Sequence, residues 1–291
     1  MASDFETQVR ATNDKINART GRPLGYAIAV GLLLGFALLF SLIFFKPIFM
    51  VFAAALIGFT AFELASALRI SGRDVPRIPT IIAAVAIVPA AFFWLAPGHW
   101  LVTLGGIAFI AVWRLVELVR PSARASAKNV LLDLAAGTFI LVYVAFMGGF
   151  TVLLTAQDGG QWWTLAFLVV VISVDLGAYA TGLAFGKHPM APVISPKKTW
   201  EGFAGSVAAA VLAGVLTAIF MLHQPWWVGV ILGLVMIATA TSGDLAESLI
   251  KRDIGIKDIS GWLPGHGGFL DRVDSSLLSA AAAYALFLIF T

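Results

Sequence analysis

Residues 226–290 read WWVGVILGLVMIATATSGDLAESLIKRDIGIKDISGWLPGHGGFLDRVDSSLLSAAAAYALFLIF, and they combine long apolar runs with a dense group of charged residues. Two apolar runs, near 226–250 and 271–290, enclose a polar segment with three Lys or Arg residues before a Pro-Gly turn and two carboxylates and an arginine after it. An apolar run of about 20 residues is long enough to cross a bilayer as a helix. Because ionisable side chains beside such helices are costly, the polar segment is a candidate functional site.

The composition extends this pattern to the whole chain. Hydrophobic residues make up 60% of the sequence and charged residues 12%, whereas soluble domains have roughly 25% charged residues. Mean hydropathy is +0.93. A period of two is not visible, so helices rather than barrel strands are expected to span the membrane. We predict an all-α, polytopic integral membrane bundle with nine transmembrane helices, near 25–45, 47–69, 79–97, 100–119, 131–155, 162–185, 202–222, 226–250 and 271–290.

Basic residues predict the orientation, because Lys and Arg are retained on the cytoplasmic side of a membrane. They precede the first span and follow the second, fourth, sixth and eighth, whereas the connections near 98–99, 155–161 and 223–225 hold none. Lys46 alone lies on the other side. This distribution predicts an amino terminus inside and a carboxyl terminus outside.

The chain divides into three predicted parts: a cytoplasmic segment 1–24, helices one to five in 25–155, and helices six to nine with the catalytic site in 156–291. The first part lacks the apolar core and cleavage site of a removable signal peptide, so the first helix is expected to remain as an anchor. The absence of cysteine excludes disulfides and thiolate metal sites. No nucleic-acid motif is visible. The longest polar connections, 187–201 and 251–270, are where chemistry is expected.

Carboxylates cluster at the ends of the last two spans. Four polar residues share one helical face by their spacing: Asp244, Glu247, Ser248 and Lys251. Asp271 and Asp274 lie in the first turn of the last span, where negative charge also suits the helix dipole. Carboxylates from neighbouring helices, with no Cys and no suitable His pair, favour a hard cation such as Mg²⁺, which commonly also binds substrate phosphates.

Cations surround these carboxylates and could hold a polyphosphate: Lys251, Arg252, Lys257 and Arg272. Lys251 and Arg252 could instead be topology anchors or contacts to lipid headgroups. A second polar block, SPKKTWEG at 195–202, carries Lys197 and Lys198 before a helix start. It is typical of a second wall of a phosphate site, or of a simple cytoplasmic turn.

Four other ionisable residues differ in how strongly the sequence supports a functional role. Asp175 lies inside the sixth span, and an intramembrane Asp argues for a water-filled cavity. His266, in a glycine-rich turn, could be a base or phosphate donor, or a hydrogen-bonding structural residue. Glu63 and Glu117 are weaker candidates, because Glu117 has Arg114 three residues earlier as a local partner.

These residues resemble the signature of the CTP:phosphatidate cytidylyltransferases, the CDP-diacylglycerol synthases. The run from Ser248 to Asp274 matches in order and spacing: Ser248, Lys251-Arg252, Lys257-Asp258, Ser260, Leu263-Pro264, His266-Gly267-Gly268, Asp271-Arg272 and Asp274. Two upstream blocks resemble further family blocks: 195–202, and Asp175 with Ala178-Tyr179 and Gly182. The resemblance covers about 175–290 of the chain.

The resemblance implies a Mg²⁺-dependent transfer of CMP from CTP to phosphatidate, which gives CDP-diacylglycerol and pyrophosphate at the cytoplasmic face of an inner (plasma) membrane. It implies Asp244 and Asp271 as metal ligands, with Lys251 on a substrate phosphate and Ser248 and Asp274 completing the shell. The other expected contacts to substrate or cofactor are Lys197, Lys198, Arg252, Lys257, His266, Arg272 and Asp175. The resemblance also suggests a second, monovalent cation, K⁺, and we keep a homodimer as a further hypothesis.

Other functions fit parts of the pattern. A CTP-dependent polyprenol or phytol kinase, or a cytidylyltransferase for archaeal-type ether lipids, could use the same nucleotide site with a different acceptor. A transporter would also place Asp175 and Asp244 inside spans, but transporters tend to show broken helices in both halves of an internal repeat. Here the polar blocks crowd the last four spans. An organellar membrane stays the alternative location.

Overall fold

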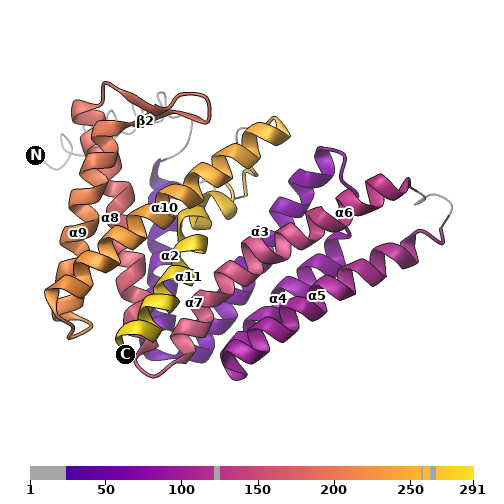
Figure 1. The fold of residues 1–291 in the computed structure, drawn as a ribbon, viewed down its shortest axis with the longest axis horizontal. Coiled ribbons are helices and arrows are strands. Elements are labelled where there is room, and N and C mark those ends of the chain that lie inside the picture. The colour runs from indigo at the N-terminus through magenta and orange to yellow at the C-terminus, as the bar shows by residue number, and fades with distance from the viewer. Residues whose placement is uncertain (1–23, 121–124, 257, 263–266) are drawn as a thin grey trace, which may run out of the picture.

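A computed structural model describes residues 24–120, 125–256, 258–262 and 267–291. The chain is helical over most of these residues (Figure 1). The helices are α2 (Leu24–Phe44), α3 (Lys46–Ile70), α4 (Arg77–Phe93), α5 (Leu95–Glu117), α6 (Ala127–Ile140), the π-helical turn η2 (Leu141–Phe146), α7 (Met147–Ala156), α8 (Gly160–Phe185), α9 (Trp200–Phe220), α10 (Trp226–Ile254) and α11 (Leu270–Phe290).

The helices confirm a polytopic membrane bundle. Within the described residues, seven helical runs are long and apolar enough to cross a membrane: α3, α5, the continuous run Ala127–Ala156, α8, α9, α10 and α11. The stretch Gly31–Phe44 of α2 and helix α4 are apolar but shorter. Each expected apolar run falls on one of these helical runs, while the count of nine spans and the orientation stay predictions.

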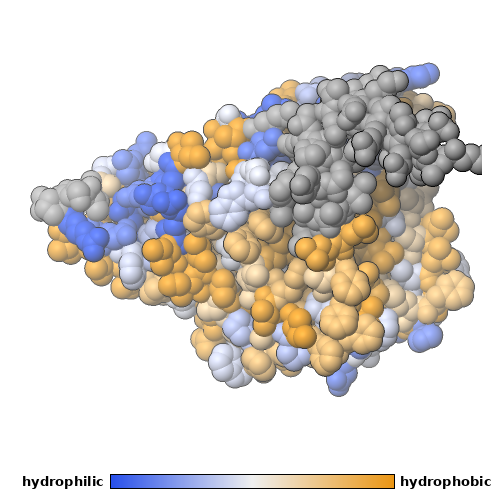
Figure 2. Space-filling model, turned by 180° about the vertical axis from the view of Figure 1, so that it is seen from behind, coloured by the Kyte–Doolittle hydropathy of each residue, from blue (hydrophilic) through white to orange (hydrophobic). Residues whose placement is uncertain are grey.

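The outer surface has the polarity expected of a membrane protein. Figure 2 shows broad hydrophobic areas on one face of the molecule, with hydrophilic residues gathered mainly toward the upper left. Large apolar side chains are exposed on several helices, including Phe36, Leu101 and Leu183. Such contiguous apolar surface is rare on soluble monomers and is typical of contact with lipid.

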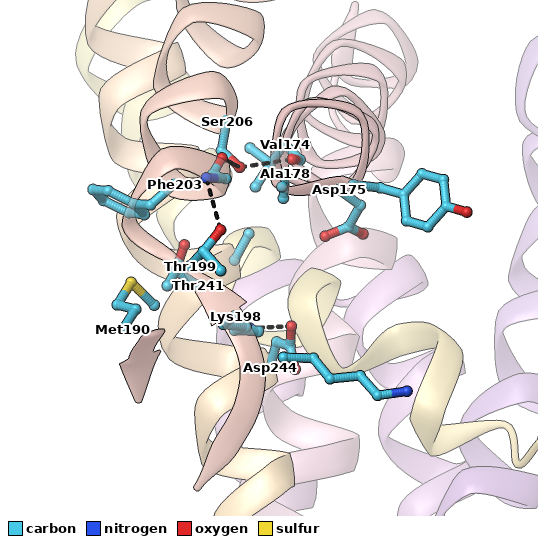
Figure 3. Close-up of a pocket in the computed structure, with 15 residues that line it drawn as sticks. Val174, Asp175, Ala178, Met190, Lys198, Thr199, Phe203, Ser206, Thr241 and Asp244 are labelled. Carbon is cyan, nitrogen blue, oxygen red and sulfur yellow. Dashed lines mark hydrogen bonds and ion pairs between the residues drawn. The ribbon is translucent and has the colours of Figure 1, made fainter. Parts of the chain in front are cut away.

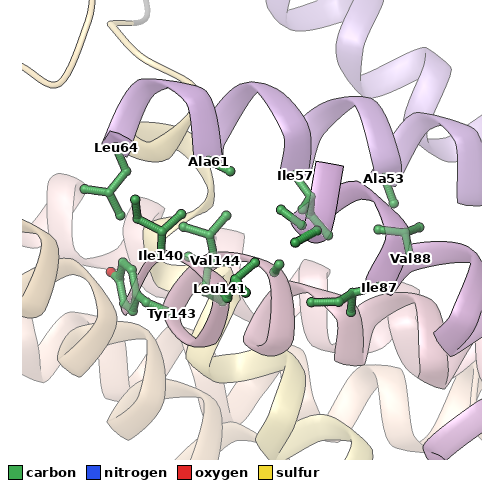
Figure 4. Close-up of a cluster of buried hydrophobic side chains, with 14 of the residues drawn as sticks. Ala53, Ile57, Ala61, Leu64, Ile87, Val88, Ile140, Leu141, Tyr143 and Val144 are labelled. Carbon is green, nitrogen blue, oxygen red and sulfur yellow. The ribbon is translucent and has the colours of Figure 1, made fainter. Parts of the chain in front are cut away.

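Two clusters of buried apolar side chains form the interior. In the first cluster, α3 faces α6 and η2 (Figure 4), through Ile57, Ala61 and Leu64 on one side and Ile140, Leu141 and Val144 on the other. The second cluster lies mainly among α8, α10 and α11. Helix α11 contributes to both, with Leu277 in the first and Ala280 in the second. It therefore joins the two groups of helices that Figure 1 shows side by side.

Glycines let the helices of the second group approach closely. A Cβ atom on Gly214 of α9 would lie 2.2 Å from the carbonyl oxygen of Gly229 in α10, and one on Gly177 of α8 would lie 2.7 Å from that of Gly205 in α9. Real side chains cannot occupy such positions, so these contacts require glycine. These small residues therefore let helix pack against helix without intervening lipid.

The polar connection after α8 contains a hairpin that the sequence did not predict. Strands β1 (Pro189–Ala191) and β2 (Ser195–Thr199) pair antiparallel, with Pro189 opposite Thr199 and Ala191 opposite Ser195. These strands are too short for a visible period of two. The Thr199 hydroxyl accepts a hydrogen bond of 3.1 Å from the backbone N–H of Gly202 and so caps α9, which confirms the expected helix start.

Candidate active site

The site begins where the backbones of α10 and α11 touch. A Cβ atom on Gly243 would lie 2.4 Å from the carbonyl oxygen of Asp274. The absence of a side chain at Gly243 therefore brings the turn that carries Asp244 against the turn that carries Asp274. A cavity of about 370 Å³ opens beside this contact, lined by Asp175, Asp244, Glu247, Lys251, Asp258, Asp271, Arg272, Asp274 and Ser275. We call it the charged cavity.

An ion-paired triad fixes the end of α10 to the start of α11. The Nζ atom of Lys251 lies 2.5 Å from Oε2 of Glu247 and 2.9 Å from Oδ1 of Asp271. The other oxygen of Asp271, Oδ2, accepts a hydrogen bond of 2.8 Å from the backbone N–H of Gly268. Glu247 is 1% exposed, and a charge buried to this degree needs such a partner.

A second ion pair brings the hairpin to the same place. Lys198 of β2 pairs with Asp244 of α10, and Figure 3 shows Asp175 of α8 pointing toward them. A second cavity of about 250 Å³ lies among α8, α9, β2 and α10. Asp175 and Asp244 line both cavities, so the two spaces adjoin. The hydroxyl of Ser248 lies 3.5 Å from Oδ1 of Asp244, which is too long for a strong hydrogen bond.

The structure brings most of the predicted site residues together. Eight of them line one or both cavities: Asp175, Lys197, Lys198, Asp244, Lys251, Asp271, Arg272 and Asp274. Arg252 is exposed and lines neither cavity; its Nε lies 3.4 Å from the carbonyl oxygen of Ile194. Lys257 and His266 lie outside the residues that the structure describes.

Two further carboxylates belong to the site or its support. Glu247 lines the charged cavity, whereas the sequence predicted only that it shares a helical face with Asp244, Ser248 and Lys251. Glu63 of α3 is 3% exposed and contacts the chain just before α11. The signal for Glu63 was its position inside an apolar run, since an ionisable side chain there needs a partner.

The charged cavity holds an excess of acid. Six of its lining residues are Asp or Glu and two are Lys or Arg. A polyphosphate would be repelled there unless a cation compensated the charge. The described lining residues offer carboxylate oxygens and no imidazole or thiolate, a donor set that suits a hard cation such as Mg²⁺.

The number of protein ligands available limits the kind of metal ion that these carboxylates could bind. Within the described part of the chain, no group of three or more His, Cys, Asp or Glu residues is placed to hold a metal ion. Mg²⁺ needs fewer protein ligands, because it usually binds one or two carboxylates and completes its shell with waters and substrate phosphates. A Mg²⁺ ion bound together with a phosphate substrate would therefore need only one or two of the lining carboxylates.

Comparison with known proteins identifies the family of this chain. Residues 26–290 match the model of the cytidylyltransferase family. The chain is 39% identical to the phosphatidate cytidylyltransferase of Mycobacterium bovis over 273 residues, which cover 92% of this chain and 89% of the relative. It is 38% identical to that of Mycobacterium leprae over 285 residues, 94% of this chain and 90% of the relative. It is 41% identical to that of Brucella suis over 157 residues, 54% and 57% of the two chains.

The chain belongs to the cytidylyltransferase family. The family predicted from the signature is thus confirmed. The match also extends through the first helices, which the signature alone did not cover.

Proposed function

We propose that this protein transfers CMP from CTP to phosphatidate, giving CDP-diacylglycerol and pyrophosphate for phospholipid biosynthesis. Membership of the cytidylyltransferase family and relatives named phosphatidate cytidylyltransferase support this proposal. The structural observation that carries it is that Arg272 lines two neighbouring spaces of opposite polarity.

One of these spaces is the charged cavity, and the other is an apolar cleft of about 220 Å³. The cleft is lined by side chains from α2, α3, α7, α8 and α11, among them Phe49, Ile57 and Leu277. A guanidinium group binds phosphate oxygens in a fork geometry. Arg272 would therefore hold the phosphate of a lipid whose acyl chains extend along the cleft toward the bilayer.

The reaction needs alignment and charge neutralisation more than a base. A phosphate oxygen of phosphatidate forms a bond to the α-phosphorus of CTP, and the bond from that phosphorus to the pyrophosphate oxygen breaks. A phosphate monoester has its second pKa at roughly 6 and is already ionised near neutral pH. The protein must hold two anions together in line, which is a task for fixed cations.

Different residues are proposed to bind the metal ion and the substrate phosphates. Asp244 and Asp271 would hold Mg²⁺, with Ser248 and Asp274 completing the shell, and the ion would stabilise charge on the attacked phosphate and the leaving pyrophosphate. Lys198 of β2 pairs with Asp244, and Lys251 of α10 pairs with Asp271. Their ammonium groups would also contact the nucleotide phosphates that the ion binds. Because carboxylates outnumber basic residues in the charged cavity, a second, monovalent cation such as K⁺ would also be electrostatically favoured there.

The proposed setting is the cytoplasmic face of an inner (plasma) membrane, with nine spans, the amino terminus inside and the carboxyl terminus outside. Lys197 and Lys198 of the hairpin line the cavity beside it, and the positive-inside rule expects basic residues of such a connection on the cytoplasmic face. Lys46, the basic residue on the other side, donates a hydrogen bond of 2.7 Å to the carbonyl oxygen of Gln157, in a connection without Lys or Arg. A homodimer is a further proposal, tested by the mass of the purified protein.

Acceptor assays with the purified protein test the function. CTP labelled in the cytidine or in the γ-phosphate is supplied with Mg²⁺ and, in separate reactions, phosphatidate, an ether-lipid phosphate, phytol or a polyprenol. We expect cytidine label in the lipid product from phosphatidate, with pyrophosphate released in equal amount. Transfer of the γ-phosphate to phytol or polyprenol, or cytidine transfer to the ether lipid alone, would contradict the proposal.

A further inference from the structure

The chain between α10 and α11 is held by a helix from the other half of the molecule. Glu63 of α3 accepts a hydrogen bond from the hydroxyl of Ser260 through Oε1, and one of 3.1 Å from the backbone N–H of Leu270 through Oε2. Ser260 and Leu270 flank the glycine-rich turn of the signature. One buried carboxylate therefore ties both ends of that turn to α3.

Aromatic contacts surround this carboxylate. The ring of Phe59, one helical turn before Glu63, stacks on Phe269 with centroids 5.0 Å apart and planes 13° apart. The ring of Phe62 lies 5.1 Å from that of Trp262. We call this set the α3 clasp: Phe59, Phe62 and Glu63 on α3, with Ser260, Trp262, Phe269 and Leu270 on the clasped segment.

The α3 clasp contacts Gly268, which is hydrogen-bonded to Asp271. A Cβ atom on Gly268 would lie 2.9 Å from Oε2 of Glu63, and the backbone N–H of Gly268 donates the hydrogen bond to Oδ2 of Asp271. Glu63 is absent from the lining of the charged cavity. It can therefore act on the reaction through Gly268 and Leu270, and not by touching a substrate.

We infer that Glu63 is a positioning residue, which holds the first turn of α11 so that Asp271 and Arg272 face the charged cavity. This inference rests on the proposed cytidylyl transfer. A displacement of about 1 Å in an aligned site can cost on the order of 100-fold in rate. Loss of the carboxylate should therefore lower turnover even where the helices stay folded.

The test compares Glu63→Gln with Glu63→Asp and with a control. Gln keeps the size of the side chain but loses the charge and one accepting oxygen, so when its oxygen accepts from the N–H of Leu270, its NH₂ group faces the Ser260 hydroxyl, which must then accept instead of donate. Asp keeps both accepting oxygens on a shorter stem. We expect kcat to fall about 10- to 100-fold in Glu63→Gln, with a smaller loss in Glu63→Asp, while the KM values for CTP and phosphatidate change less than kcat does.

Asp133→Asn supplies the matched control. Asp133 is also 3% exposed, and it also accepts one backbone and one side-chain donor, the N–H of Asp74 and the guanidinium of Arg114, each at 2.8 Å. It lines neither the charged cavity nor the cavity beside the hairpin. We expect this variant to lose thermal stability with kcat within about twofold of wild type.

A thiol-labelling measurement reports on the segment itself. The chain has no cysteine, and Ile259 of the same segment is partly buried against the first cluster of apolar side chains, so Ile259→Cys gives one partly buried thiol. We expect Glu63→Gln to raise its maleimide labelling rate at least about threefold, because opening of the segment becomes easier, and Asp133→Asn to leave it unchanged. Unchanged kcat or unchanged labelling in Glu63→Gln would overturn the inference. Absence of cytidylyl transfer in the wild type would instead refute the proposed function, while the labelling would still test the α3 clasp.

Discussion

Lys251 of α10 donates a hydrogen bond of 2.9 Å to Asp271 of α11, across the segment that connects the two helices. The same ammonium group pairs with Glu247 one turn earlier on α10. Two carboxylates and a lysine are thus held together by direct contacts within the protein. Such preorganisation is useful where the reaction brings phosphate anions together, because the protein does not reorganise during the reaction.

Neutralising either proposed metal ligand should stop the reaction without unfolding the protein. Asp271→Asn and Asp244→Asn keep the shape of the side chain and remove its charge. We expect each to lower the rate of CDP-diacylglycerol formation at least about 100-fold. Asp253→Asn is the control, because Asp253 is an exposed carboxylate on the same helix. Turnover near wild type in purified Asp244→Asn or Asp271→Asn would remove the catalytic assignment.

The contact between Gly243 and Asp274 should tolerate no side chain. Gly243→Ala places a methyl group where the carbonyl oxygen lies at 2.4 Å. We expect a loss of about 1–3 kcal/mol in the free energy of unfolding, together with lower activity, because α10 and α11 are pushed apart. Gly105→Ala, on α5 with nothing within 4 Å, should not destabilise the protein. Denaturant unfolding in detergent measures both, and equal stabilities would show that the helices can separate at no cost.

Arg272 should affect the lipid more than the nucleotide. Since it lines the apolar cleft as well as the charged cavity, Arg272→Gln is expected to raise the KM for phosphatidate at least about tenfold and the KM for CTP less. Steady-state kinetics in mixed micelles separate the two constants. Lys128→Gln, which removes an exposed charge at the start of α6, serves as the control. An equal rise in both constants would argue against a lipid phosphate at Arg272.

Labelling of single cysteines tests the proposed orientation. Val193 lies in the hairpin and is 85% exposed, and Asp158 lies exposed in the connection between α7 and α8. In sealed vesicles of known orientation, an impermeant maleimide should reach Val193→Cys only from the cytoplasmic side and Asp158→Cys only from the opposite side. Labelling of both from one side would contradict nine spans with the amino terminus inside.

Local patterns in the sequence predict much of this structure. Apolar runs give the helices, because each run satisfies its own backbone in lipid, and the four-residue spacing of Glu247 and Lys251 predicts the pair that the structure contains. Asp175, Lys198, Asp244 and Asp271 were named from charge among apolar spans, and all four line the cavities.

Contacts between segments that are far apart in the chain cannot be predicted from such local patterns. Ser260 and Glu63 are 197 residues apart in the chain, so the spacing of residues within one helix cannot predict their hydrogen bond. The short hairpin and the π-helical turn at Leu141–Phe146 are set by tertiary packing and not by a visible period. Lys251 and Arg252 differ by about 100° around the helix, so only one of them can face the charged cavity.

Nucleotide binding by the purified protein shows whether Asp244 of α10 and Asp271 of α11 share a divalent ion that holds the phosphates of CTP. Calorimetric titrations of CTP into wild type, Asp244→Asn and Asp271→Asn, with Mg²⁺ and with EDTA, separate the roles of ion and carboxylate. We predict that wild type binds CTP with Mg²⁺ and at least about tenfold more weakly in EDTA, and that the two variants lose this dependence. Equal binding by wild type in both conditions, or a full Mg²⁺ effect in either variant, would contradict the account.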